Sequence, residues 1–195
     1  MTSRERILDG AAFVMRDRGL ARATTKEIAR AAGVSEALLY KVFQDKTDIF
    51  LAVFSERLPR VGVLSEGLAT GAGRGSLKSN LRQLVAELLS FYLESFPIAA
   101  SVFSDPDLLE RHRETLRERD AGPARMVQGV AAYLRAEQAE GRIGSSVRPA
   151  VVAELLVGAC LHRAFLLSFQ QQRPAATTVR RFAADIVSTL TPILL

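Results

Sequence analysis

The residues from 24 to 46 combine side chains that suit a nucleic-acid backbone with side chains that suit base edges. Thr25 and Lys26 stand at the amino end of an expected helix, where a hydroxyl, an ammonium group and free backbone N–H groups favour a phosphate. The helix expected next along the chain carries the candidates for base readout: Ser35, Glu36, Ala37, Leu38 and Lys41. Phosphate contacts and base contacts would thus come from adjacent helices.

The candidate base contacts differ in the chemistry that they offer. Glu36 cannot help to bind a phosphate, but its carboxylate can accept from the N4 amino group of cytosine. Leu38 can make only apolar contact, for instance with a thymine methyl group. Lys41 could donate to guanine O6 and N7 or to a phosphate, and both contacts remain open. The residue types therefore support DNA binding without revealing the bound sequence.

Two short helices joined by a glycine turn are expected to position these side chains. Thr24 can cap the first helix, because its hydroxyl can accept from a free N–H and Glu27 can reach back from three residues on. Gly33 is expected to adopt the left-handed conformation that ends this helix. The apolar face of the helix comprises Ile28, Ala29 and Ala32.

The next two helices also begin at residues that can cap them. Ser35 can cap the second helix, and Asp45 can cap the third with Asp48 at the spacing of a capping box. The inward side of the second helix is expected to hold Leu39, Val42 and Phe43. Two helices across a tight glycine turn place the second helix in the major groove of DNA.

The spacing of these residues resembles the DNA-binding signature of the TetR family of bacterial transcriptional regulators. Residues 24–46 contain T-T-x-x-I-A-x-x-A-G-V-S-x-x-x-L-Y-x-x-F-x-x-K, with R-x-x-I-L-D-G-A upstream and K-x-D-I-F downstream. The resemblance implies a homodimer whose helical C-terminal domain binds a small molecule and thereby releases DNA. Since family members dimerise through their last two long helices, the resemblance also implies this interface for the present chain.

The resemblance assigns further roles residue by residue. Thr25 and Lys26 match positions that contact the DNA backbone, and Tyr40 and Lys46 match a tyrosine and a lysine that reach phosphates. The alternative for Tyr40 is a core aromatic ring with a solvated hydroxyl. This chain departs from the family at position 36, which is often basic, and at position 42, where Val42 is expected to pack instead of contacting DNA.

Composition places limits on the class of protein. The chain has 195 residues, of which 48% are hydrophobic, and its net charge is +5. Residues 1–50 contain nine basic and seven acidic side chains, so a positive DNA-facing surface would have to arise from geometry. One cysteine, Cys160, excludes an intrachain disulfide and a cysteine zinc site. No apolar run is expected to be long enough to span a membrane, and the expected location is the cytoplasm.

The whole chain is expected to be all-α, with about nine helices. We expect a helix-turn-helix domain over residues 1–48 and a ligand-binding and dimerisation domain over residues 49–195, with a glycine-rich loop at 67–76. Helices are expected over 3–18, from Lys46, from Leu77 until Pro97 bends or ends it, at 98–104, from Pro106 after a cap at Asp105, over 124–140, over 150–169, and after a cap at Thr177.

The last two helices are more apolar than a monomer of this size requires. The helix over 150–169 is apolar almost all round, which predicts burial on several sides. The last helix carries an apolar stripe. A four-helix bundle made by two copies of the chain would cover both helices.

A pocket for a hydrophobic or aromatic ligand could be built from aromatic and soft side chains of the C-terminal half. The candidates are Tyr92, Phe96, Phe103, Met126, Tyr133, His162 and Phe165. The competing interpretation is an ordinary core, in which most aromatic residues at helical spacing are found. We expect His162 to be buried, His112 to be exposed, and Cys160 to have a raised pKa and low reactivity.

No catalytic motif accompanies these features, so we expect no enzyme activity, no cofactor and no metal site. The expected function is a DNA-binding transcriptional regulator, most simply a repressor released from its operator by a small ligand. A ligand-independent or architectural DNA-binding protein is the alternative.

Overall fold

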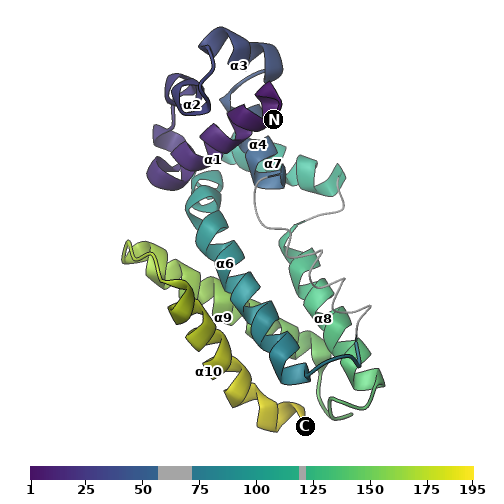
Figure 1. Cartoon of the computed structure of the whole chain (residues 1–195). Helices are drawn as coiled ribbons and strands as arrows, with labels where there is room; N and C mark the ends of the chain where they lie inside the picture. The colour runs from purple at the N-terminus through teal and green to yellow at the C-terminus, as the bar shows by residue number, and fades with distance from the viewer. Residues whose placement is uncertain (57–71, 119–121) are drawn as a thin grey trace. The chain divides into compact units, whose positions relative to one another are not determined.

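The computed structural model describes residues 1–56, 72–118 and 122–195, and these ranges contain helices and no strand (Figure 1). The helices are α1 (Ser3–Arg22), α2 (Thr25–Ala32), α3 (Glu36–Val42), α4 (Lys46–Glu56), α6 (Leu77–Phe103), α7 (Pro106–Glu118), α8 (Pro123–Ala139), α9 (Pro149–Phe169) and α10 (Ala176–Leu194). The all-α prediction is confirmed. Pro59 and residues 67–71 of the expected loop lie outside the described residues.

The chain forms two compact units that interleave along the sequence. The first unit contains residues 1–56 and 94–118, and the second contains residues 72–93 and 122–195. Helix α6 contributes to both units, because its residues up to 93 belong to the second and the rest to the first. The helix-turn-helix segment therefore belongs to the same unit as α4, α7 and the end of α6.

Helix α1 forms the centre of the first unit. Ile7, Leu8, Ala11 and Met15 are fully buried along one side of it. A Cβ atom at Gly10 would lie 2.7 Å from the backbone nitrogen of Ala32, so α1 and α2 approach each other closely at this position. Gly19, where we predicted the helix to stop, has φ 72° and interrupts the helical geometry inside α1.

The predicted caps of the helix-turn-helix are present. Thr24 and Glu27 form the reciprocal capping box, in which the Glu27 N–H donates to Thr24 Oγ1 and the Thr24 N–H donates to Glu27. Gly33 ends α2 in the left-handed region with φ 63°. Ser35 Oγ accepts from the Leu38 N–H at 3.1 Å and so starts α3. Local sequence spacing is sufficient to set these termini.

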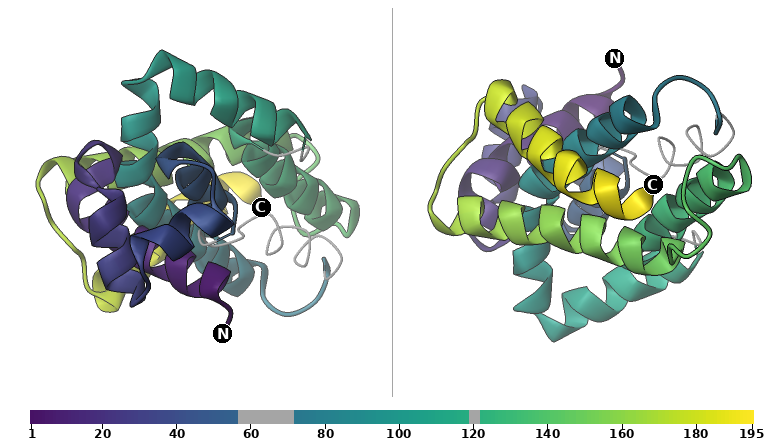
Figure 2. Two further views of the ribbon diagram at one scale, coloured as in Figure 1. Left: turned by 90° about the horizontal axis from the view of Figure 1, so that it is seen from above. Right: turned by 90° about the horizontal axis from the view of Figure 1, so that it is seen from below.

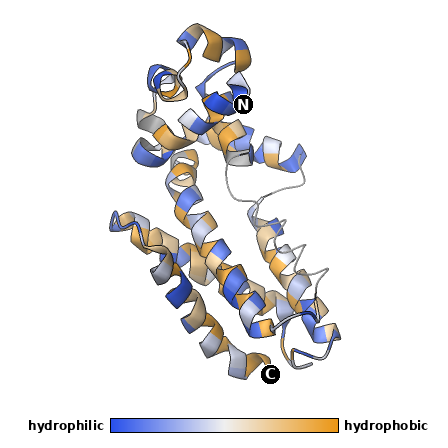
Figure 3. Cartoon of the chain, in the orientation of Figure 1, coloured by the Kyte–Doolittle hydropathy of each residue, from blue (hydrophilic) through white to orange (hydrophobic). Residues whose placement is uncertain are grey.

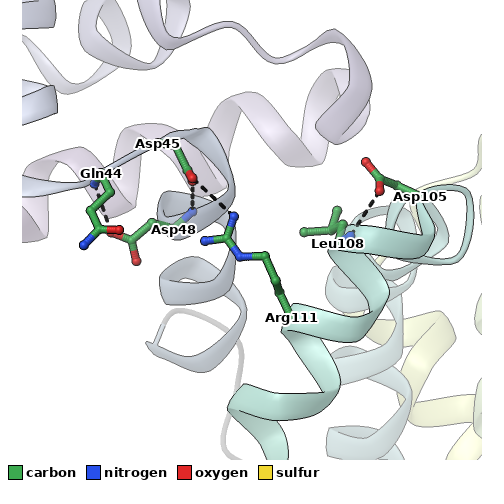
Figure 4. A network of polar contacts seen from close by, with 6 residues as sticks. All are labelled: Gln44, Asp45, Asp48, Asp105, Leu108 and Arg111. Atoms are coloured by element: carbon green, nitrogen blue, oxygen red, sulfur yellow. Dashed lines mark hydrogen bonds and ion pairs between the residues drawn. The ribbon is translucent and has the colours of Figure 1, made fainter.

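A polar network joins the start of α4 to α7 within the first unit (Figure 4). Asp45 Oδ1 accepts from the Asp48 N–H at 2.7 Å, which confirms the predicted cap. The Asp48 carboxylate accepts from the Gln44 N–H at 3.2 Å and not from Asp45 itself. Arg111 of α7 donates to Asp45 Oδ2 at 3.2 Å. Just before α7, Asp105 Oδ1 accepts from the Leu108 N–H at 3.0 Å and caps the helix as expected.

Two predicted helix boundaries are wrong. Helix α6 continues through Pro97 to Phe103, so residues 98–104 are not a separate helix. Burial of Ile98 and Val102 favours this continuation against the missing hydrogen bond of the proline. Helix α10 begins at Ala176, after an extended Ala175 with no side-chain cap, so Thr177 lies inside the first turn. The alanine favours an earlier helix start than the threonine does.

The second unit has a core formed by α6 up to Leu93 with α8, α9 and α10. Cys160 of α9 is buried there, and its thiol donates to the carbonyl of Val85 on α6 at 3.7 Å. The turn between α8 and α9 meets the end of α10, where the Gly144 N–H donates to the Leu194 carbonyl at 2.8 Å (Figure 2). These contacts tie the carboxyl end of the chain to the bundle.

In the single chain, helix α9 is buried on one side only, and the predicted burial on its other side would require the second copy of the chain. Its inner face holds Val152, Ala153, Leu156, Val157, Cys160, Ala164 and Leu167. A second set of apolar residues on the helix is exposed: Val151, Leu155, Leu161, Phe165 and Phe169. Figure 3 colours each residue by its hydropathy and shows apolar and polar residues alternating along the helices that Figure 1 labels.

By length and composition α9 could cross a membrane, so the prediction that no apolar run is long enough was wrong. This is weak support for a membrane protein, because the core helices of soluble proteins pass the same test.

Candidate nucleic-acid interface

Helix α3 exposes both polar and apolar side chains to solvent, while buried residues in it and directly after it anchor it. Leu39 is fully buried, and Phe43 just after the helix is 3% exposed. Most of the residues predicted to read bases are exposed, namely Ser35, Glu36, Ala37 and Lys41, and Leu38 is half-buried. The anchoring residues thus leave the opposite side of this short helix open to a partner.

The candidate phosphate contacts lie on three helices of the same unit. Thr25 is half-buried and Lys26 exposed in the first turn of α2, and Tyr40 of α3 is 52% exposed. Lys46 begins α4 and is half-buried. Exposure of the Tyr40 ring disfavours the alternative in which it is a core aromatic residue.

Hydrogen bonds connect α2 and α3 on this surface. The hydroxyl of Thr25 lies 2.5 Å from Glu36 Oε1, and the hydroxyl of Tyr40 lies 3.3 Å from Thr25 Oγ1. The structure thus joins two predicted phosphate contacts to a predicted base contact.

Two arginine side chains of α1, which were not among the predicted contacts, bind residues at the ends of α2 and α3. The guanidinium group of Arg6 donates to the carbonyls of Ala32 at 3.2 Å and Gly33 at 2.5 Å, where α2 ends. Arg4 forms an ion pair with Glu56 of α4 and lies 5.2 Å above the centre of the Phe43 ring. Basic residues on the expected first helix were the available signal, but their partners are distant in sequence.

Asp45, which caps α4 directly after the helix-turn-helix, has a perturbed pKa. Partial burial acts to raise its pKa, but hydrogen bonds from the Asp48 N–H and Arg111, with the positive charge of Arg111, outweigh burial. The pKa of Asp45 is therefore below its ordinary value, and its carboxylate stays ionised as the cap of α4.

The seven candidate ligand residues are not all in one unit. Phe96 and Phe103 belong to the first unit, and the other five belong to the second. Tyr133 is fully buried, Met126 and Tyr92 are half-buried, and burial raises the pKa of Tyr92 to about 12. Phe96 is half-buried, whereas Phe103 and Phe165 are 76% and 44% exposed.

The predicted environments of the two histidines were wrong. His162 is exposed, because it lies on the outward face of α9. His112 is half-buried, and its ring centre lies 6.4 Å from that of Phe50 in an edge-on arrangement. Burial lowers the pKa of His112 below its usual value.

A shallow, open hollow of about 480 Å³ in the second unit is lined by Gly73, Gly75, Leu77, Gly141, Arg142 and Leu195, none of which is a predicted ligand residue. Cys160 lies elsewhere in the core, and burial raises its pKa to about 12, as predicted.

The capped α2, the left-handed turn at Gly33 and the open side of α3 define a helix-turn-helix DNA-binding regulator. Residues 7–53 match the family model described as bacterial regulatory proteins, tetR family. The sequence pattern predicted this same family of transcriptional regulators, and the match to its model over residues 7–53 confirms that prediction.

Relatives extend the similarity beyond the matched segment. An uncharacterized HTH-type transcriptional regulator of Bacillus subtilis (strain 168), YdgC, is 28% identical over 171 residues, which cover 85% of this chain and 82% of YdgC. A solved structure assigned to the TetR family from Mesorhizobium loti MAFF303099 has a TM-score of 0.74 at 21% identity, covering 98% of this chain and 96% of the other.

A further solved structure is FadR from Bacillus subtilis in complex with stearoyl-CoA, with a TM-score of 0.65 at 17% identity. The similarity covers 94% of this chain and 96% of FadR. These two structures share the fold of this chain over the residues that the similarity covers.

Proposed function

We propose that this protein is a homodimeric repressor that binds a pseudo-palindromic operator and releases it when a small hydrophobic or aromatic ligand binds. The observation that carries the DNA-binding part is the exposure of Glu36, Ala37 and Lys41 on α3, while Leu39 of the same helix is buried. A helix anchored in this way can enter a major groove with these side chains toward the base edges.

The backbone contacts in this proposal come from Thr25, Lys26, Tyr40 and Lys46. Their hydroxyl and ammonium groups are chemically suited to phosphate oxygens, and such contacts set the register of a protein on DNA. Ser35, Glu36, Ala37, Leu38 and Lys41 would then meet base edges. Within this set Ser35 has a second role, because its hydroxyl already caps α3.

A second copy of the chain is the proposed partner of α9. Its exposed apolar residues recur at helical spacing along one side, and α10 exposes Ile193 and Leu195 at its end. Covering each large apolar side chain contributes about 1.5–3 kcal/mol. A dimer would place two α3 helices about 34–36 Å apart, on successive major grooves. The same association would explain why an apolar helix belongs to a cytoplasmic protein.

The ligand part of the proposal rests on the aromatic and soft side chains of the C-terminal half. Tyr92, Met126 and Tyr133 are at least half-buried in the second unit and supply apolar surface with two hydroxyl groups. FadR, which shares the fold, is described in complex with stearoyl-CoA, a ligand with a long apolar chain. A ligand would release DNA only if it bound more tightly to the conformation that does not fit the operator.

Selection of bound sequences from a random DNA pool, followed by titration of the best sequence at several salt concentrations, tests this function. Recovery of a two-fold symmetric site with strong preference over random DNA is the expected result. Candidate ligands can then be screened by release of that site. Binding to all sequences alike, with a steep dependence on salt, would favour an architectural DNA-binding protein instead.

A further inference from the structure

The surface proposed to meet DNA contains a chain of hydrogen bonds that ends at a carboxylate. Glu36 Oε1 lies 2.5 Å from Thr25 Oγ1, which in turn lies 3.3 Å from the hydroxyl of Tyr40. Glu36 and Tyr40 are exposed, and Thr25 is half-buried at the start of α2. These two hydrogen bonds therefore connect Glu36 in the first turn of α3 to Thr25 in the first turn of α2, and Thr25 to Tyr40 of α3.

The direction of each hydrogen bond follows from the chemistry of the groups. An ionised carboxylate can only accept, so Thr25 must donate its single hydroxyl proton to Glu36. The oxygen of Thr25 can then only accept from Tyr40, which donates its own proton. Both hydroxyl protons are thus directed toward Glu36.

This direction conflicts with simultaneous phosphate binding. A phosphate oxygen of DNA accepts hydrogen bonds and cannot donate them. While Glu36 accepts the hydrogen bond of Thr25, and Thr25 accepts that of Tyr40, neither hydroxyl group can donate to a phosphate. In addition, the negative charge of Glu36 lies beside the groups that would receive the phosphate. Glu36 must therefore turn away from Thr25 before these two contacts can form.

We infer that Glu36 couples the reading of one base pair to the phosphate contacts of Thr25 and Tyr40, an inference that rests on the proposed DNA-binding function. On the preferred site the carboxylate exchanges the hydroxyl of Thr25 for the N4 amino group of cytosine. Thr25 and Tyr40 can then donate their protons to phosphate oxygens. On other sites the carboxylate stays with Thr25, and the phosphate contacts are lost.

Cytosine is the base that suits this exchange. Its major-groove edge offers the N4 amino donor, and the paired guanine presents the acceptors N7 and O6. Adenine also offers an amino group, but its N7 acceptor lies next to it and would repel the second carboxylate oxygen. Guanine and thymine present no amino donor in the major groove. The predicted preference is therefore for cytosine at one position of each half-site.

The coupling distinguishes this role from simple charge repulsion. If Glu36 only repelled DNA, its replacement would strengthen binding to every sequence equally. If it reads a base, its replacement must change the sequence preference as well. If it also controls the hydroxyl protons, loss of the Tyr40 hydroxyl must matter on the preferred site and not on a site without the cytosine.

The experiment measures binding to the selected site and to single-base-pair variants of it at one salt concentration. Wild-type protein is compared with Glu36→Ala, Glu36→Gln and Tyr40→Phe. Glu114→Gln is the control, because it removes one negative charge from an exposed position on α7 of the same unit. Thermal unfolding of each variant establishes that it is folded.

We expect wild-type protein to prefer cytosine at one position by about 5- to 150-fold, the range of a good base contact. Glu36→Ala should lose this preference and bind sites without the cytosine more tightly than wild type does. Glu36→Gln should prefer adenine, whose N6 and N7 it can contact together. Tyr40→Phe should weaken binding to the cytosine site and leave binding to the substituted site unchanged. Glu114→Gln should retain the wild-type preference.

Several results would overturn the inference alone. They are an unchanged base preference in Glu36→Ala, or an equal effect of Tyr40→Phe on both sites, since independent contacts are additive. Failure of wild-type protein to select any symmetric site would overturn the proposed function and this inference with it.

Discussion

Arg111 of α7 donates to the carboxylate of Asp45 at 3.2 Å, and Asp45 is the residue that caps α4. The two residues are 66 positions apart in the sequence. One carboxylate therefore both starts the helix that follows the helix-turn-helix and holds α7 against it (Figure 4).

Removal of Arg111 should weaken the first unit only slightly at neutral pH. Both side chains of the pair are about half exposed, and exposed ion pairs typically contribute about 0–1 kcal/mol. Arg111→Ala is expected to lower the free energy of unfolding within this range, measured by urea denaturation. Arg113→Ala is the control, since Arg113 pairs with Glu110 on its own helix. A larger loss for Arg113→Ala would contradict the proposed role of Arg111.

The contribution of the Asp45 charge should disappear in acid. Its pKa is depressed in the folded protein, so the carboxylate stabilises the fold above the ordinary pKa of aspartate, about 3.9. This contribution is lost as pH falls through the folded pKa. Asp45→Asn retains a side chain that can cap α4. The difference in urea midpoint between wild type and Asp45→Asn should therefore shrink between pH 6 and pH 3, and a constant difference would exclude the charge as its cause.

Gly10→Ala should destabilise the helix-turn-helix unit. The added Cβ atom would lie 2.7 Å from the backbone nitrogen of Ala32, and neither helix can move aside without losing core contacts. Overpacking of this kind costs about 1–3 kcal/mol, which exceeds the gain in helix propensity of about 1 kcal/mol. Thermal unfolding measures the effect, with the exposed Phe13→Ala on the same helix as control. Equal stability of Gly10→Ala and wild type would show that the helices separate easily.

Lys41→Ala should weaken operator binding by about 1–3 kcal/mol if the lysine contacts a base. Because Lys41 is exposed on α3, a loss of binding in Lys41→Ala would not be explained by a folding defect. A gel-shift titration at fixed salt measures the loss, and repetition on single-base variants separates the two alternatives. A base contact gives a loss that depends on sequence, whereas a phosphate contact gives a uniform loss and a smaller salt dependence. Unchanged affinity would remove Lys41 from the interface.

Leu155→Glu should convert the proposed dimer into monomers. Leu155 is 58% exposed in the single chain, in the first half of the open apolar side of α9. A charge there would be buried without a partner in the dimer. Light scattering after size-exclusion chromatography measures the mass. Arg135→Glu, an exposed change on α8, is the control and should remain dimeric. A wild-type protein that is monomeric at all concentrations would reject this interface.

Short-range features of the fold could be predicted from spacing alone. The capping box of Thr24 and Glu27, the turn at Gly33 and the cap at Ser35 each depend on residues within four positions of one another. The start of α10 shows the limit of this approach, because Thr177 satisfied the same rule and a neighbouring alanine started the helix instead. Pro97 marks a similar limit, since burial of Ile98 and Val102 carries α6 past it.

The sequence by itself determined the helix-turn-helix, its caps and the set of side chains available to meet DNA, because these depend on backbone hydrogen bonds between near neighbours. Only the tertiary structure decided which faces are buried and which distant groups pair. Exposure of His162, partial burial of His112, the Arg111–Asp45 pair and the bond from Thr25 to Glu36 all depend on how helices pack. Periodicity marks an apolar face without specifying its partner, and for this reason the open side of α9 emerged only from the fold.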